Sequence, residues 1–234
     1  MSIVGIIGAM EEEISNIKPY IEIVANKNVA GLDFYIGNMS GHNVILVRSG
    51  IGKVNASVCT QILIDLYGVD CIINVGVAGA IANELGIGDI VISEDTQHHD
   101  FDTTHFGDKL GEIPRMDTSV FKADKELVQL AKECAEEEVK NNQSVYIGKI
   151  VSGDQFVCDL DLKNNIKKIF KPKCVDMESA SIGQVCYLNN VPFVVIRSIS
   201  DGSDDNNPDE YENFFRDSAI KASLVLNNMI NKIK

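Results

Sequence analysis

Short apolar runs rich in isoleucine and valine recur along the chain, and this pattern constrains the fold more than any other feature of the sequence. The runs occupy residues 3–8, 44–47, 71–75, 90–92, 147–151 and 193–196. Nearly continuous apolar strands are typical of a sheet that is buried on both faces, and helical segments between them favour parallel connections. The sequence therefore predicts an α/β fold with a central, mostly parallel sheet.

Helices are predicted where apolar residues return every three or four positions. A helix after Gly52 would align one apolar face, which we expect to pack against the core. That face consists of Val54, Val58, Ile62 and Leu66. The same periodicity predicts helices over 124–140 and over 215–233. At 234 residues the chain suits one domain, spanning 1–234, better than two comparable ones.

The charge balance limits the possible partners. The chain carries 34 acidic and 21 basic residues, a formal net charge of −13. This charge would repel a nucleic acid backbone or an anionic membrane, so neither is expected as a partner, and no apolar run approaches the roughly 18 residues that a membrane span needs. The six cysteines form no C-x-x-C pair, so we expect them to be reduced core residues in a cytoplasmic protein.

Several familiar ligand-binding motifs are absent or incomplete. The dinucleotide pattern G-x-G-x-x-G does not occur, and "SGIGK" at 49–53 follows a valine at the place where a phosphate-binding loop needs its first glycine. Another candidate is a run of metal-ligating residue types: His98, His99, Asp100, Asp102 and His105. Its spacing matches no standard zinc pattern, and polar loops commonly collect such residues, so no metal is expected.

Glycine-rich stretches follow three of the apolar runs: "SGIGKV", "VGVAGA" and "VSGDQF". Ligands of open α/β sheets bind beyond the carboxyl ends of the strands, and glycine lets backbone amides approach a ligand closely. Each stretch alone could simply form a tight turn. The three together favour a ligand site at this edge of the sheet.

Three carboxylates arrive at the same edge, namely Glu13 after the first run, Glu178 in "VDMESA" and Asp201 in "VIRSISD". Each of them could instead cap a helix or face water. Glu178 is the hardest to explain in that way, because "DMESA" opens a helical run through Ile182 and Val185 and places the acid at an interior-facing turn.

Seven blocks of the sequence resemble the bacterial 5'-methylthioadenosine/S-adenosylhomocysteine nucleosidases. The blocks are "GAMEEE", "SGIGKVNA", "GVAGA", "LGIGDIVIS", "VSGDQF", "VDMESA" and "VPFVVIRSISD". They follow the family's order and spacing over nearly the whole chain. The resemblance implies a three-layer α/β/α nucleoside phosphorylase-like fold with a mixed central sheet, and a homodimer. It also implies hydrolysis of the N-glycosidic bond of 5'-methylthioadenosine and S-adenosylhomocysteine, releasing adenine and a 5-thioribose product without a cofactor.

The resemblance also implies roles for individual residues. Glu13 corresponds to the carboxylate that activates water, Asp201 to the acid that protonates the leaving adenine, and Glu178 to the acid that holds the ribose hydroxyls. The other substrate contacts are Met177 at the sugar, Phe156 and Val157 at the adenine, Met10, Ile51 and Tyr211 at the thioalkyl group, and Val77, Ala78, Gly79, Arg197 and Ser200 around the catalytic region. The residues expected from a partner subunit are Thr103, Phe106 and Pro114.

One position departs from the family pattern. Many relatives have serine where this chain has Val77. In the family that hydroxyl helps to position the acid, so we expect Ser200 or Ser203 to take its place beside Asp201.

Cleavage between an anomeric carbon and a purine nitrogen needs an acid for the leaving base and a nucleophile for the cationic sugar. Asp201 would have to stay protonated near neutral pH, which requires burial or a neighbouring charge to raise its pKa. Glu13 would have to stay ionised, for which we expect a wetter and better hydrogen-bonded environment. Glu11 and Glu12 are expected to serve the helix N-terminus and the surface. Because three consecutive acids would repel phosphate, water is the predicted nucleophile.

Three alternatives remain open from the sequence. A phosphate-dependent purine nucleoside phosphorylase of the same fold would be stimulated by phosphate and would yield a sugar phosphate. A relative acting on another adenine nucleoside, such as an aminofutalosine, would differ in the shape of its pocket. A non-catalytic adenine-nucleoside sensor would have no need to keep Glu13, Glu178 and Asp201 together.

Overall fold

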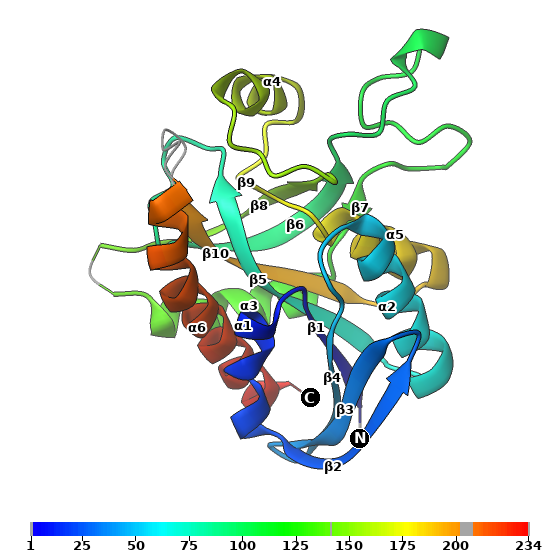
Figure 1. The fold of residues 1–234 in the computed structure, drawn as a ribbon, viewed down its shortest axis with the longest axis vertical. Helices are drawn as coiled ribbons and strands as arrows, with labels where there is room; N and C mark the ends of the chain where they lie inside the picture. Colours follow the sequence, from blue (N-terminus) through cyan, green and yellow to red (C-terminus); the bar gives the residue numbers. More distant parts are fainter. Residues whose placement is uncertain (1, 141, 202–207, 234) are drawn as a thin grey trace.

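The computed structural model describes residues 2–140, 142–201 and 208–233, with side chains described up to residue 201 and again from residue 214 (Figure 1). Ten strands within these residues belong to one sheet. They are β1 (Ile3–Gly8), β2 (Glu22–Val29), β3 (Leu32–Met39), β4 (His42–Arg48), β5 (Cys71–Ala80), β6 (Ile90–His98), β7 (Phe121–Lys122), β8 (Val145–Ser152), β9 (Cys174–Asp176) and β10 (Phe193–Asp201).

The central strand β5 pairs in parallel with both β1 and β10. From β10 the pairing continues to β6, β8 and β9, and β9 returns to β5, so that these five strands close on themselves. On the other side, β1 pairs in parallel with β4, and β4, β3 and β2 form an antiparallel meander. The short strand β7 is added to β6.

The mixed sheet implied by the resemblance is confirmed. The apolar runs pair mostly in parallel, as predicted, with β10 and β6 as the antiparallel exception. The other antiparallel pairs involve β2, β3, β7 and β9, which the sequence did not predict. Part of the antiparallel pairing comes from two tight turns, which join β2 to β3 and β3 to β4. In each turn both residues have positive φ, namely Ala30 and Gly31 in the first and Ser40 and Gly41 in the second. Such turns match the twist of antiparallel hairpins.

Helices cover both faces of the sheet. The α-helices are α1 (Glu11–Ser15), α2 (Lys53–Tyr67), α3 (Lys125–Glu138), α4 (Leu160–Phe170), α5 (Ser179–Asn189) and α6 (Pro208–Lys232), and two short 3₁₀ helices lie at Lys18–Tyr20 and Thr104–Phe106. Helices α1, α3 and α6 share one apolar core with the sheet, and α2 and α5 share the other (Figure 1). The predicted three-layer architecture is confirmed, as are the buried apolar faces of α3 and α6.

Three of the four residues predicted for the apolar face of α2 do not pack against the core, whereas Ile62 does. Val54 is 73% exposed and Leu66 is 62% exposed, whereas Ala56, Cys59 and Leu63 are buried. The prediction is wrong because periodicity shows which residues share a helical face but not which face meets the sheet. The helix turns Ala56, Cys59 and Leu63 inward, and the exposed part of its apolar stripe, Val54, Val58 and Leu66, lies on the surface of the single chain.

Two of the apolar runs are the first parts of longer strands. Beyond residues 75 and 196, β5 and β10 continue side by side through small and polar residues. In their register Arg197 lies opposite Gly76, and Asp201 lies opposite Gly79. These strand ends carry the candidate site.

Five of the six cysteines are buried, as predicted, and the sixth, Cys158, is exposed. All six are free thiols. In the described part of the chain, no helix is both long and apolar enough to cross a membrane.

Candidate active site

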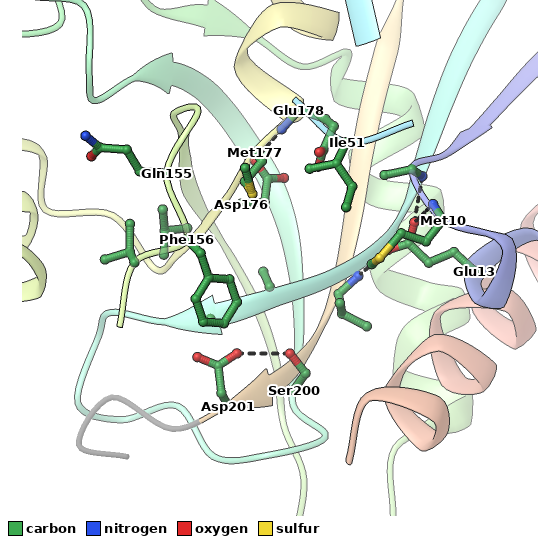
Figure 2. Close-up of a pocket in the computed structure, with 16 residues that line it drawn as sticks. Met10, Glu13, Ile51, Gln155, Phe156, Asp176, Met177, Glu178, Ser200 and Asp201 are labelled. Carbon is green, nitrogen blue, oxygen red and sulfur yellow. Dashed lines mark hydrogen bonds between the residues drawn. The ribbon is translucent and has the colours of Figure 1, made fainter. Parts of the chain in front are cut away.

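A cavity opens beyond the carboxyl ends of β1, β5, β9 and β10, and Figure 2 shows its side chains converging on a common space. It brings together twelve residues predicted for the site: Met10, Glu13, Ile51, Val77, Ala78, Gly79, Phe156, Val157, Met177, Glu178, Ser200 and Asp201. The cavity is also lined by four residues that the sequence did not single out: Ala9, Gln155, Val175 and Asp176.

Glu13 is the third residue of α1, and its carboxylate is held by backbone N–H groups from two strand ends. Oε2 accepts from the N–H of Ala9 at 2.6 Å and of Met10 at 3.0 Å, and Oε1 accepts from the N–H of Val77 at 3.1 Å. A Cβ at Gly76 would collide with this carboxylate, so glycine is needed there.

The expected hydrogen bonds to Glu13 are therefore present, but the expected wetter environment is wrong, because the side chain is buried. Burial raises the pKa of Glu13 above its ordinary value. The positive charge of Arg197 and the three backbone N–H groups act in the opposite direction and favour the ionised form. Glu11 and Glu12 lie at the surface as predicted, and Glu11 pairs with Lys18.

Arg197 does not line the cavity but lies behind it, only 2% exposed. Its Nε and Nη2 both contact Asp176 Oδ2 at 2.8 Å, and Nη2 donates to Asn74 Oδ1 at 2.5 Å. The hydroxyls of Ser152 and Ser179 also donate to Asp176. This buried network places a compensated positive charge next to Glu13.

Glu178 is the N-cap residue of α5, and its side chain turns into the cavity as predicted (Figure 2). Its Oε1 accepts from the N–H of Gly52 at 2.9 Å. Burial, followed by the negative charge of Asp176, raises the pKa of Glu178 to about 8, although Arg197 and the Gly52 N–H oppose this shift.

Asp201 ends β10 and is half-buried, near Phe156 in the view of Figure 2. The Ser200 hydroxyl donates to Asp201 Oδ1 at 3.0 Å, which is the contact expected from Ser200. Ser203, the other candidate, lies outside the described residues. The side chain of Val77 instead packs in a small apolar cluster with Phe215.

The three residues expected from a partner subunit do not line the cavity of their own chain. Thr103, Phe106 and Pro114 belong to the long connection between β6 and β7, which projects from the body in Figure 1. Phe106 is 84% exposed. Tyr211 lies in α6, but its side chain is outside the described part of the chain.

The histidine and aspartate residues considered as metal ligands are dispersed. His98 and His99 are buried, Asp100 pairs with Lys53, and Asp102 accepts hydrogen bonds from its own loop. Among the described residues, no group of three or more His, Cys, Asp or Glu side chains is arranged to hold a metal ion.

Comparison with known proteins gives full-length matches. Residues 3–231 match the sequence model of the phosphorylase superfamily. The chain is 41% identical over 231 residues to the 5'-methylthioadenosine/S-adenosylhomocysteine nucleosidase of Tolumonas auensis, covering 98% of this chain and 99% of that protein.

Two solved structures have the same fold over their whole length. A 5'-methylthioadenosine/S-adenosylhomocysteine nucleosidase from Colwellia psychrerythraea, in complex with adenine, matches with a TM-score of 0.92 and 36% identity over 100% of this chain and 96% of that one. The futalosine hydrolase of Helicobacter pylori matches with a TM-score of 0.93 and 33% identity over 99% of this chain and 98% of that one.

Proposed function

The chain belongs to the phosphorylase superfamily and, within it, to the 5'-methylthioadenosine/S-adenosylhomocysteine nucleosidases, and on this premise we propose that it hydrolyses the N-glycosidic bond of both thionucleosides, releasing adenine and a 5-thioribose product. The observation that carries the proposal is the convergence of Glu13, Glu178 and Asp201 on one cavity beside the Phe156 ring. The proposed reaction uses no cofactor, and a cytoplasmic location stays a prediction.

In the proposed reaction, Asp201 protonates the leaving adenine and Glu13 takes a proton from the attacking water. Figure 2 places these two acids on opposite sides of the cavity. That separation suits the reaction, because the base leaves from one face of the anomeric carbon while water attacks the other. Phe156 offers an aromatic face for the adenine, and Met10 and Ile51 offer an apolar lining for the thioalkyl group.

The environment of Arg197 supports water rather than phosphate as the nucleophile. A phosphorylase needs cationic donors that are free to bind a phosphate dianion. Here the guanidinium is buried and already bound to Asp176 and Asn74. The adjacent carboxylate of Glu13 would also repel an oxyanion.

Glu178 is suited to hold the ribose hydroxyls. Burial raises its pKa to about 8, which favours the protonated form when no positive charge develops beside it. A sugar that becomes cationic near the transition state favours the ionised form, so the interaction with Glu178 grows as the bond breaks.

The proposal is tested by incubating the purified protein with 5'-methylthioadenosine, with and without inorganic phosphate, and identifying the products by chromatography. We expect adenine and a free thiosugar at the same rate in both samples. A phosphate-dependent rate with a sugar phosphate product would instead identify a phosphorylase. Binding without turnover would identify a sensor.

A second candidate function is cleavage of another adenine nucleoside, such as an aminofutalosine. It is favoured by the likeness to a futalosine hydrolase, whose TM-score equals or exceeds those of the nucleosidases. Values of kcat/KM for 5'-methylthioadenosine, S-adenosylhomocysteine and an aminofutalosine, measured on one preparation, distinguish the two candidates.

We also propose that the protein is a homodimer. The apolar stripe of α2 is exposed in the single chain, and Leu188 of the neighbouring helix α5 is 61% exposed. Exposed apolar side chains that lie together on neighbouring helices commonly mark an interface. A dimer would cover it, and the projecting loop with Phe106 would complete the thioalkyl pocket of the second copy.

A further inference from the structure

Two motifs that the proposed reaction leaves unused meet in the structure. Lys53, from the "SGIGK" stretch, is the first residue of α2, and Asp100, from the histidine-rich stretch, follows β6 closely. The Lys53 Nζ lies 2.7 Å from Asp100 Oδ1 and 2.8 Å from Oδ2. Both side chains are largely shielded, with 22% and 15% of their surface exposed.

The same two residues bind Asp154. This residue lies in the loop between β8 and α4, which we call the adenine loop because it carries Phe156 and Val157, the proposed adenine contacts. The backbone N–H of Lys53 donates to Asp154 Oδ1 at 2.8 Å, and the backbone N–H of Asp154 donates to Asp100 Oδ2 at 2.9 Å. The three residues therefore form a closed ring of interactions, which we call the 53–100–154 ring.

The turn before Lys53 connects this ring to the ribose side of the cavity. Gly52 donates its N–H to Glu178 Oε1, one residue before Lys53 binds Asp154. Gly52 has a φ of +95°, and a Cβ there would lie 3.0 Å from Asp154 Oδ1. In this turn, Gly52 therefore contacts Glu178 on the ribose side, and the next residue, Lys53, contacts the adenine loop at Asp154.

The adenine loop is largely exposed to solvent in the single chain. Asp154, Gln155 and Phe156 are all exposed, with Phe156 at 56%, and among the described core clusters the loop contributes Val157. A loop without a packed core depends on its polar contacts for a defined geometry. The 53–100–154 ring supplies those contacts at its N-terminal end.

From this geometry we propose that Lys53 and Asp100 are positioning residues, which hold the adenine loop at a fixed separation from Glu178 so that base and ribose are bound together. The proposal rests on the proposed function for the identity of the substrate and for the assignment of adenine to this loop and of ribose to Glu178. It assigns neither residue a contact with the reacting atoms.

The test compares Lys53→Met with the wild type. We expect KM for 5'-methylthioadenosine to rise about tenfold with a smaller change in kcat, because the ring positions a binding loop rather than a catalytic group. The inhibition constant for adenine should rise by the same factor, since adenine binds through this loop. Lys53→Arg should restore most of the affinity, because it keeps the cation beside Asp100.

A double-mutant cycle and a matched control separate positioning from ordinary stabilisation. If the pair acts as a unit, Lys53→Met combined with Asp100→Asn should bind little worse than either single variant. Lys149→Met breaks another lysine–aspartate pair of similar burial, with Asp95 at 2.6 Å, and should leave KM and adenine binding unchanged.

A lower melting temperature with unchanged KM and adenine inhibition would overturn the proposal, as would a loss confined to kcat. If the wild type did not cleave 5'-methylthioadenosine, the proposed function would fail. The affinity for adenine, measured by calorimetry on the wild type and on Lys53→Met, would then still test whether the 53–100–154 ring positions the adenine loop.

Discussion

The two sides of the cavity are built differently. The interior wall, formed by Glu13, Asp176 and Glu178 with Arg197 behind it, is buried, and its charges are held by hydrogen bonds from strands and helix ends. The open side, formed by Ile51, Phe156 and Asp201, lies on a turn, a loop and a strand end, and Ile51 and Phe156 are each more than half exposed.

This difference teaches that the two halves of the proposed reaction depend on different parts of the fold. On the interior wall the fold itself fixes the charges that face the sugar and the water. On the open side the base would meet Ile51 and Phe156, which lie on an exposed turn and loop, and Asp201, which stands at the end of the buried strand β10. A change in the interior wall should therefore affect both stability and catalysis, whereas a change on the open side should affect catalysis alone.

The largest expected effect comes from the two proposed catalytic acids. Asp201→Asn and Glu13→Gln should each lower kcat/KM by about 100- to 10,000-fold, the usual contribution of a general acid or base. Only Glu13→Gln should also lower the melting temperature, because the amide NH2 replaces one accepting oxygen and must face either the N–H of Val77 or those of Ala9 and Met10. Calorimetry and steady-state kinetics on both variants check this, and equal melting temperatures would refute the contrast.

The acid side of the pH profile sharpens the contrast further. Glu13 must be ionised to accept a proton, and burial raises its pKa above the ordinary value of 4.5. We therefore expect kcat/KM to fall as the pH drops through a value higher than 4.5, by about tenfold for each pH unit below it. The fall should persist in Glu178→Gln, which removes the buried acid whose pKa is raised to about 8. The prediction would be contradicted if kcat/KM began to fall only at or below pH 4.5 in protein that circular dichroism shows to be folded.

A mutation of the α2 stripe tests whether a second copy completes the open side. Val54→Lys should shift the mass measured by light scattering from two chains to one. Cleavage should then fall several-fold, because Ile51 would lose the cover that the proposed dimer provides. Val24→Lys, at a valine on β2 that is 71% exposed, is the matched control and should leave mass and activity unchanged. A single-chain mass for the wild type would remove the proposed dimer.

The positions of secondary-structure elements could be predicted from the sequence where burial requires apolar residues. The strands that form the centre of the sheet are apolar on both faces, so their positions could be predicted. The β2–β3 hairpin was missed because it lies at the margin of the sheet, where half-polar sequences such as "EIVANKNV" give a weak pattern. Helix α4 was missed although "LDLKNNIKKIF" has the periodicity of an amphipathic helix, with Ile166 and Phe170 buried.

The candidate site could be predicted largely through the motif resemblance, but its electrostatics could not. Asp176 was overlooked although it stands two residues before Glu178, because its importance comes from Arg197, which is distant in sequence. The burial of Glu13 was also misjudged. A carboxylate can be held ionised by backbone N–H groups as well as by water, and which of these applies depends on how separate strands meet.

The smallest expected effect is a rise in melting temperature when Glu178 of the interior wall is replaced by glutamine. Glu178 has a pKa of about 8 in the folded protein against an ordinary value of 4.5, so the folded state binds more protons between these two pH values. The free energy of unfolding contributed by this group must therefore decrease as the pH rises through that window. Glutamine has no charge to bury, so Glu178→Gln should melt at a temperature similar to the wild type near pH 5 and a few degrees higher near pH 8. Glu12→Gln, at an exposed carboxylate on the same edge, should follow the wild type at both pH values. If the melting temperature of Glu178→Gln did not rise relative to the wild type between pH 5 and pH 8, burial would not destabilise the ionised form of Glu178, and the prediction would be wrong.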